Sequence, residues 1–149
     1  MNFEFFTTTR IVFGSGCYKN LAHLINDIGR SVLVVTGSSD RFILDLLEIL
    51  ERKGIAAHRF QVSHEPSVNT IREGVQLARE SECDFVIGLG GGSVIDAAKA
   101  ISAMLTNEGD VLDYVEVIGA GRKLKRSSLP CIAIPTTAGT GAEVTVNAV

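Results

Sequence analysis

The sequence has little of what marks secreted or membrane-spanning proteins. Its three cysteines, Cys17, Cys83 and Cys131, are widely spaced and form no CxxC motif, a pattern that favours reduced thiols over a disulfide framework. No apolar run reaches the length of a membrane span, and residues 1–4 do not resemble a signal peptide. We therefore expect a cytoplasmic protein with no membrane partner.

The chain has no large excess of either sign of charge. The chain has 14 Lys and Arg against 17 Asp and Glu, for a net charge of −3. The only basic run, residues 122–126, is interpreted as a solvated loop, and this balance argues against a nucleic-acid partner. The histidines, His23, His58 and His64, lack the spacing of a metal site, and we expect no metal ligand among them.

What the chain has in quantity is an alternation of strand and helix signals. Extended pieces are expected within residues 3–13. Apolar runs predict strands at 32–35, 57–62, 86–89 and 129–135, and apolar residues at helical spacing predict helices at 21–28, 43–50, 68–78 and 94–105, with a helical turn at 111–114. This order predicts a single α/β, Rossmann-like layered domain over residues 1–149 with a mostly parallel sheet.

The densest glycine stretch, Gly90-Gly91-Gly92, lies between a predicted buried strand and a predicted helix. Successive glycines permit unusual backbone angles or the close approach of a ligand to the backbone. Ser93 is the expected N-cap of the helix, and Asp96 is expected near its positive end. A strand, a glycine turn and a helix N-terminus together predict a phosphate site; a tight turn without a ligand is the alternative.

Three polar or glycine-rich loops follow predicted strands, at residues 36–40, 88–93 and 135–141. Ligands of parallel sheets bind beyond the carboxyl ends of the strands. Convergence of the three loops there predicts a single nucleotide site.

Two motifs carry a family resemblance. Residues 90–99, GGGSVIDAAK, and residues 135–145, PTTAGTGAEVT, resemble the two signatures of the iron-containing alcohol dehydrogenases. The Phe13-Gly14-Ser15-Gly16 turn also resembles the start of that family, so the resemblance covers essentially the whole chain.

This resemblance implies the N-terminal, NAD(P)-binding half of a two-domain fold shared with dehydroquinate synthase. A helical C-terminal domain, absent from this chain, would hold iron or zinc through an Asp and three His. The full-length enzyme would interconvert alcohols and aldehydes or ketones, and a homodimer is expected. The apolar alternation over residues 144–149 has no stop signal, which also predicts a fragment.

Site residues follow from the resemblance position by position. It implies pyrophosphate contacts by Gly91, Gly92 and Ser93, a loop or cofactor contact by Asp96, and further cofactor contacts by Thr136, Thr137, Thr140 and Thr145. Ordinary capping of turns by the threonines is the alternative. No catalytic residue or metal ligand falls in the chain, so the isolated chain is expected to bind cofactor without dehydrogenase activity. A self-contained, non-catalytic nucleotide-binding module is the alternative function.

One departure from the family pattern concerns the choice of cofactor. Many members place an Asp directly after the strand at 32–36, where a carboxylate binds the ribose 2′-OH and repels a 2′-phosphate. Here that position is Gly37, followed by Ser38 and Ser39. Gly37 and Ser38 are expected to contact the cofactor, and NADP is expected to bind at least as well as NAD. Asp40 is interpreted either as a helix cap or as a ribose ligand.

Overall fold

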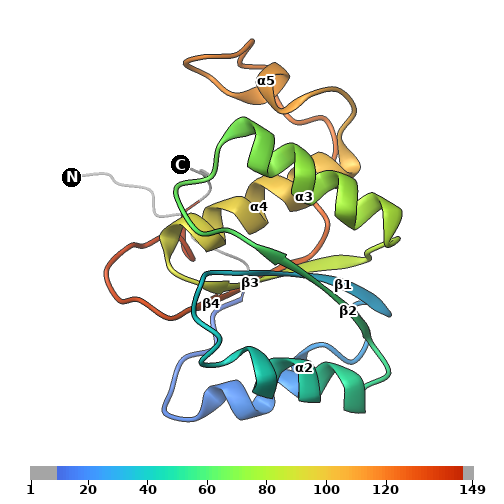
Figure 1. Ribbon diagram of the computed structural model, residues 1–149, viewed down its shortest axis with the longest axis vertical. Coiled ribbons are helices and arrows are strands. Elements are labelled where there is room, and N and C mark those ends of the chain that lie inside the picture. The colour runs from blue at the N-terminus through green and yellow to red at the C-terminus, as the bar shows by residue number, and fades with distance from the viewer. Residues whose placement is uncertain (1–9, 146–149) are drawn as a thin grey trace, which may run out of the picture.

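A parallel sheet organises the computed structural model, which describes residues 10–145 (Figure 1). Its four strands lie in the order β2-β1-β3-β4, and every described pairing is parallel. The strands are β1 (Ser31–Thr36), β2 (Ala56–Gln61), β3 (Phe85–Gly90) and β4 (Cys131–Pro135). The helices are the 3-10 turn η1 (Cys17–Asn20), α1 (Leu21–Leu24), α2 (Ile43–Arg52), α3 (Val68–Glu80), α4 (Gly92–Thr106) and α5 (Val111–Tyr114).

Helices cover both faces of the sheet. Figure 1 shows α3 and α4 on one side, and α2 with the N-terminal helical segment on the other. Successive side chains of β1 alternate between the two cores: Leu33 and Val35 pack with α3 and α4, whereas Val32 and Val34 pack with α2. Because both faces are covered, every position of the apolar run 32–35 is buried. The predicted α/β architecture with a parallel sheet is confirmed.

The chain departs from the sequence-based prediction near its N-terminus. The helix predicted over 21–28 ends at Leu24, and the chain continues from Ile25 as a non-helical turn. Leu21 and Ile25 are both buried in the core. Of the extended pieces predicted within 3–13, residues 10–13 form no strand and the rest lies outside the described residues. Residues 146–149 of the predicted terminal alternation also lie outside them.

Helix α4 packs against β3 at close range. A Cβ added to Gly88 would lie 2.9 Å from the Cβ of Ala98, and a Cβ added to Gly90 would lie 2.7 Å from the Val94 side chain. These two glycines therefore allow the close packing of helix on strand. Their packing fixes where α4 begins relative to the end of β3.

Beyond α4, residues 107–128 form an outer segment that contains α5 and lies over α3, away from the sheet (Figure 1). Asn107 is buried and holds this segment through its side-chain amide, which donates to the Arg126 carbonyl and accepts from the Lys125 and Arg126 backbone N–H groups. Within residues 10–145, none of the helices combines the length and apolar character needed to cross a bilayer.

Candidate functional site

A cavity of about 310 Å³ lies at the carboxyl edge of the sheet. Figure 1 shows the loops after β1, β3 and β4 reaching the same end of the sheet, at the left of the view. Residues from all three contribute to the lining: Gly37, Ser38, Ser39, Arg41, Phe42, Leu89, Gly90, Gly91 and Thr136. The predicted convergence of three loops at one edge is confirmed.

The turn from β3 to α4 is built differently from the prediction. Gly91, not Ser93, is the N-cap, with an extended backbone (φ −81°, ψ −170°). Its carbonyl accepts the first helical bond, from the N–H of Ile95 at 3.1 Å. The helix therefore starts at Gly92 and places Asp96 in the second turn, so the first turn has no acidic residue. The prediction of Asp96 at the positive helix end was wrong for the same reason.

Close approach, rather than unusual backbone angles, explains Gly91 and Gly92. Neither has a positive φ. A Cβ on Gly91 would lie 3.1 Å from Thr137 Oγ1, and a Cβ on Gly92 would lie 3.4 Å from the Cβ of Thr140. The two glycines thus bring the threonine loop against the bare first turn of α4.

Thr136 closes the group of threonines near the helix start. It lines the cavity, and its N–H donates to the Gly90 carbonyl at 2.8 Å. Thr140 Oγ1 also accepts from the Ala142 N–H at 3.5 Å, a local turn bond of the kind the alternative interpretation expects. The structure therefore brings Thr136, Thr137 and Thr140 together with Gly91 and Gly92.

Asp96 and Thr145 are connected through Lys99, a residue that the sequence analysis did not single out. The Lys99 ammonium lies 2.8 Å from Asp96 Oδ1, and these side chains are only 18% and 17% exposed. Lys99 also donates to the Ala142 carbonyl at 2.9 Å and to Thr145 Oγ1 at 3.1 Å. This network attaches the segment after the threonine loop to α4. Asp96 and Thr145 therefore position backbone near the cavity, and neither is among the residues that line it.

Ser93 is engaged by a residue from another loop. Its hydroxyl donates to Glu65 Oε2 at 2.7 Å, and Glu65 lies in the exposed loop between β2 and α3. A carboxylate therefore stands beside the first turn of α4. Neither a periodicity nor a motif indicated this contact.

The turn from β1 to α2 is held by charge. Asp40 is not the cap of α2, because the N-cap is Phe42. Its carboxylate instead pairs with the guanidinium of Arg59 on β2, and Arg59 Nε donates to Thr36 Oγ1 at 3.1 Å. Arg41 and Phe42 line the cavity beside Ser38 and Ser39. The sequence alone did not identify Arg59, because its proximity depends on the strand order.

The described residues do not form a metal site. Within residues 10–145, no group of three or more His, Cys, Asp or Glu side chains is arranged to hold a metal ion. His23 lies on α1, His58 on β2 and His64 in the loop after β2. The described residues therefore do not provide a set of ligands for iron or zinc.

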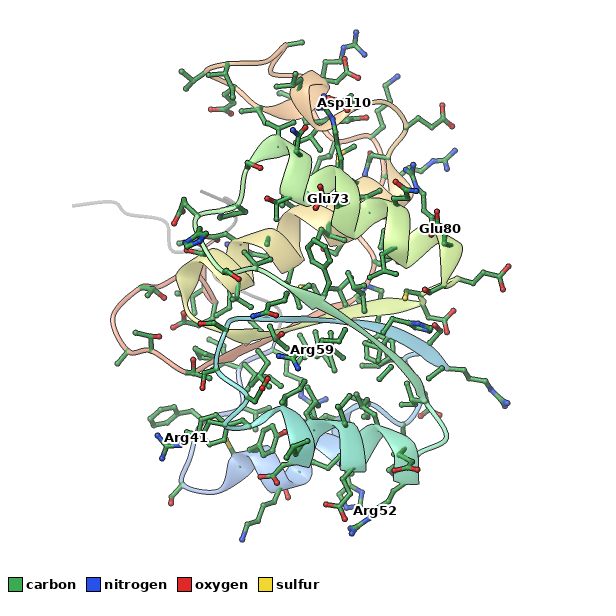
Figure 2. The ribbon with its side chains drawn as sticks, in the orientation of Figure 1. Arg41, Arg52, Arg59, Glu73, Glu80 and Asp110 are labelled. Carbon is green, nitrogen blue, oxygen red and sulfur yellow. The ribbon has the colours of Figure 1, made fainter. Side chains whose placement is uncertain are left out.

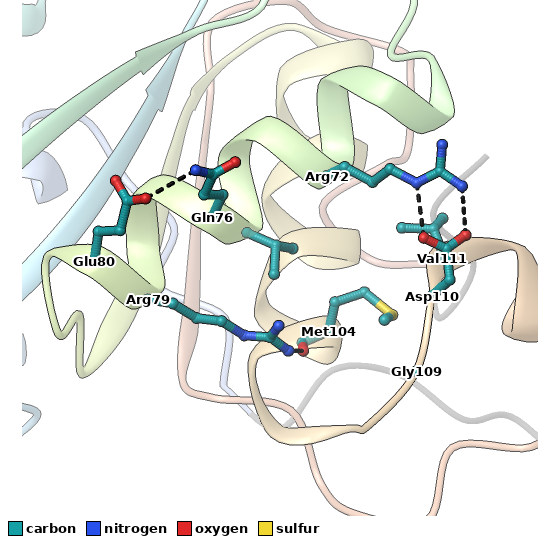
Figure 3. A pocket seen from close by; sticks show the side chains of 9 residues that line it. Arg72, Gln76, Arg79, Glu80, Met104, Gly109, Asp110 and Val111 are labelled. Atoms are coloured by element: carbon teal, nitrogen blue, oxygen red, sulfur yellow. Dashed lines mark hydrogen bonds and ion pairs between the residues drawn. The ribbon is translucent and has the colours of Figure 1, made fainter.

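A second hollow, of about 300 Å³, lies between α3, the end of α4 and α5 (Figure 3). Its polar side chains are already paired. Arg72 contacts both carboxylate oxygens of Asp110 at 2.7 Å, and Arg79 donates to the Met104 carbonyl at 2.9 Å. The hydrogen bonds from Arg72 lower the pKa of Asp110 to about 2. These pairs attach α3 to α5 and to the end of α4, so the polar side chains of this hollow have a structural role. We therefore take the cavity at the sheet edge as the candidate site.

Comparison with known sequences gives a consistent result. Residues 8–149 match the family model described as iron-containing alcohol dehydrogenase. Alcohol dehydrogenase 4 of Schizosaccharomyces pombe is 35% identical over 139 residues, which cover 90% of this chain and 32% of that protein. Long-chain-alcohol dehydrogenase 1 of Geobacillus thermodenitrificans is also 35% identical, over 93% of this chain and 38% of that protein. The chain therefore spans only about a third of the length of these relatives.

Solved structures match as well. An iron-containing alcohol dehydrogenase from Thermotoga maritima superimposes with a TM-score of 0.81 at 37% identity, covering 95% of this chain and 40% of that one. Sulfoacetaldehyde reductase from Bifidobacterium kashiwanohense, solved in complex with NAD+, gives a TM-score of 0.80 at 27% identity, covering 97% and 39%. The chain is thus similar over nearly its whole length to one part of these longer proteins.

Proposed function

This chain belongs to the iron-containing alcohol dehydrogenase family, and we propose that it is the NAD(P)-binding part of an enzyme that transfers hydride between the cofactor and an alcohol, aldehyde or ketone. The observation that carries this proposal is the cavity at the carboxyl edge of the sheet, where a bare helix start meets a loop of threonines. Ligands of open parallel sheets bind at this edge.

In this proposal the cofactor pyrophosphate lies against the first turn of α4. The N–H groups there have no helical partners, and the helix dipole favours an anion. Gly91 and Gly92 carry no side chain of their own, so the phosphates would reach the backbone beside the Thr137 and Thr140 side chains that approach the two glycines. The hydroxyls of Thr136, Thr137 and Thr140 are the accompanying hydrogen-bond donors.

The remaining residues orient what is bound. The nicotinamide, when bound, supplies the hydride chemistry, and the protein supplies binding and orientation. Lys99 holds the 142–145 segment in place through Ala142 and Thr145, and Asp96 neutralises its charge. We assign no step to a metal in these residues. The iron or zinc and the substrate pocket are proposed to belong to the helical part of the full-length enzyme.

The resemblance and the composition support the wider features of the proposal. We propose that the full-length enzyme is a cytoplasmic homodimer whose small-molecule substrate is an alcohol or aldehyde, and that it has no nucleic-acid or membrane partner. The relatives named as alcohol dehydrogenases support this substrate class.

Calorimetric titration of NAD and NADP into the chain tests the proposal. We expect at least one of them to bind, and Gly91→Val to weaken binding by about tenfold, or roughly 1.4 kcal/mol, because the added side chain would press on Thr137 and crowd the proposed phosphate position. Gln76→Val, which places the same side chain in the second hollow, should not change affinity. With an alcohol present, the chain alone should produce no reduced cofactor.

Melting curves separate loss of the site from loss of the fold. A Gly91→Val variant that unfolds near the wild-type temperature but no longer binds would support the phosphate assignment. Native affinity in that variant, or a wild-type chain that binds neither cofactor, would contradict the proposal.

A further inference from the structure

We propose that Arg41 recognises the 2′-phosphate of NADP, and that the Asp40–Arg59 ion pair keeps the neighbouring carboxylate away from that phosphate. This inference rests on the proposed function, since it concerns the same cavity. It names the residues that decide between the two nicotinamide dinucleotides.

Arg41 is a cation in the wall of the cavity. It lies there with Ser38 and Ser39, on the turn that follows β1. The ion pairs found among residues 10–145 do not include Arg41. Its guanidinium carbon lies 5.1 Å from the centroid of the Phe42 ring, a cation–π contact that limits where the charge can move. Its charge is therefore available to an anionic ligand.

Asp40 would oppose this role if its carboxylate faced the same space. A carboxylate next to the phosphate position favours NAD and repels NADP. The structure directs it elsewhere, because Arg59 takes the Asp40 carboxylate in an ion pair. Arg59 is held in turn by its hydrogen bond to the hydroxyl of Thr36, a residue that is only 1% exposed.

The strand order makes this pairing possible. Residue 59 pairs in register with Val34 on β1, two residues before Thr36. Figure 2 shows Arg41 and Arg59 on the α2 side of the sheet. The two adjacent charged residues therefore have different partners. Asp40 pairs with Arg59 of β2, and Arg41 lines the cavity.

The chemistry of the turn fits a phosphate monoester. A guanidinium presents several N–H donors in one plane and binds phosphate through two of them at once. Ser38 and Ser39 add hydroxyl groups, and Gly37 adds no charge. Because the turn is exposed, solvent screens the interaction, and we expect an effect of about tenfold in affinity rather than a thousandfold.

The test measures the dissociation constants of NADP and NAD for four proteins: the wild-type chain, Arg41→Gln, Arg59→Gln and Arg52→Gln. Arg41→Gln should weaken NADP binding by about tenfold and change NAD binding by less than about twofold. Arg59→Gln should weaken NADP by about threefold, because it releases the Asp40 carboxylate. Arg52→Gln removes an exposed arginine of α2 that pairs with Glu48, and should change neither constant.

A double variant separates positioning from packing. Adding Asp40→Asn to Arg59→Gln should restore NADP affinity, because the repelling charge is then gone. NAD affinity reports in every variant that the site is folded. If Arg41→Gln leaves the ratio of NADP to NAD affinity unchanged, this inference is overturned while the proposed function stands. A wild-type chain that binds neither cofactor would overturn the proposed function, and this inference with it.

Discussion

Two turns lead from a strand into a helix beside the cavity, and they differ in what holds them. The β3–α4 turn is formed by glycines at the end of a fully buried strand, and packing against Ala98 and Val94 fixes it. The β1–α2 turn, residues 37–42, is exposed apart from Gly37, which is half-buried, and an ion pair with β2 holds it. The first turn depends on the absence of side chains, and the second depends on their charge.

This difference separates two tasks within one cavity. The glycine turn offers backbone to the part that NAD and NADP share, so a side chain added there is expected to harm both. The charged turn lies where the two cofactors differ, so substitutions there should change the preference without unfolding the protein.

The largest effect is expected for Gly88→Val. A Cβ at residue 88 would lie 2.9 Å from the Ala98 Cβ and 3.4 Å from the Ile95 Cα, so α4 must move away from β3. We expect the free energy of unfolding to fall by about 3 kcal/mol in urea denaturation. Gly37→Ala is the matched control, because its Cβ would meet only Val94 at 3.7 Å and should cost less than about 0.5 kcal/mol. Equal losses in the two variants would show that the turns do not differ as described.

A smaller effect is expected for Gly37→Asp. The new carboxylate would stand at the position that repels a 2′-phosphate, so the ratio of NADP to NAD affinity should fall by about tenfold. Gly37→Asn has the same size without the charge and should leave the ratio within about twofold. Titration of both cofactors into both variants measures this. An unmoved ratio in Gly37→Asp would place residue 37 away from the ribose.

The smallest effect is expected for Glu65→Gln. The Glu65 carboxylate accepts from the Ser93 hydroxyl beside the first turn of α4, where it opposes the proposed pyrophosphate. Gln keeps an acceptor for Ser93 and removes the charge, so both cofactors should bind about two to three times more tightly. Glu73→Gln, an exposed site on α3, is the control. Weaker binding in Glu65→Gln would mean that the carboxylate assists the ligand.

The sequence predicted the fold well where a single element carries its own pattern. The continuous apolar runs of β1 and β3 indicated buried parallel strands. The cap of α4 was mispredicted, because a glycine in extended conformation can start a helix without a side chain. The helix at 21–28 was overextended, since apolar spacing reports burial and continues through a turn.

The candidate site shows the same limit. Loops that follow parallel strands must meet at one edge, so Gly91, Thr136 and the Gly37 turn could be placed together from the sequence. Contacts set by pairing between distant segments could not. Arg59 reaches Asp40 only because β2 lies beside β1, and Lys99 joins α4 to Thr145 across more than forty positions.

The central claim is that the cavity at the carboxyl edge of the sheet binds a nicotinamide dinucleotide. Backbone amide chemical shifts, followed during titration with NADP, test it most directly. We expect saturable shifts concentrated at residues 37–41, 90–93 and 136–140, with little change at Arg72, Gln76 and Arg79 in the second hollow. Shifts concentrated in that hollow, or no saturable shift at the sheet edge, would show that the cavity does not bind the dinucleotide.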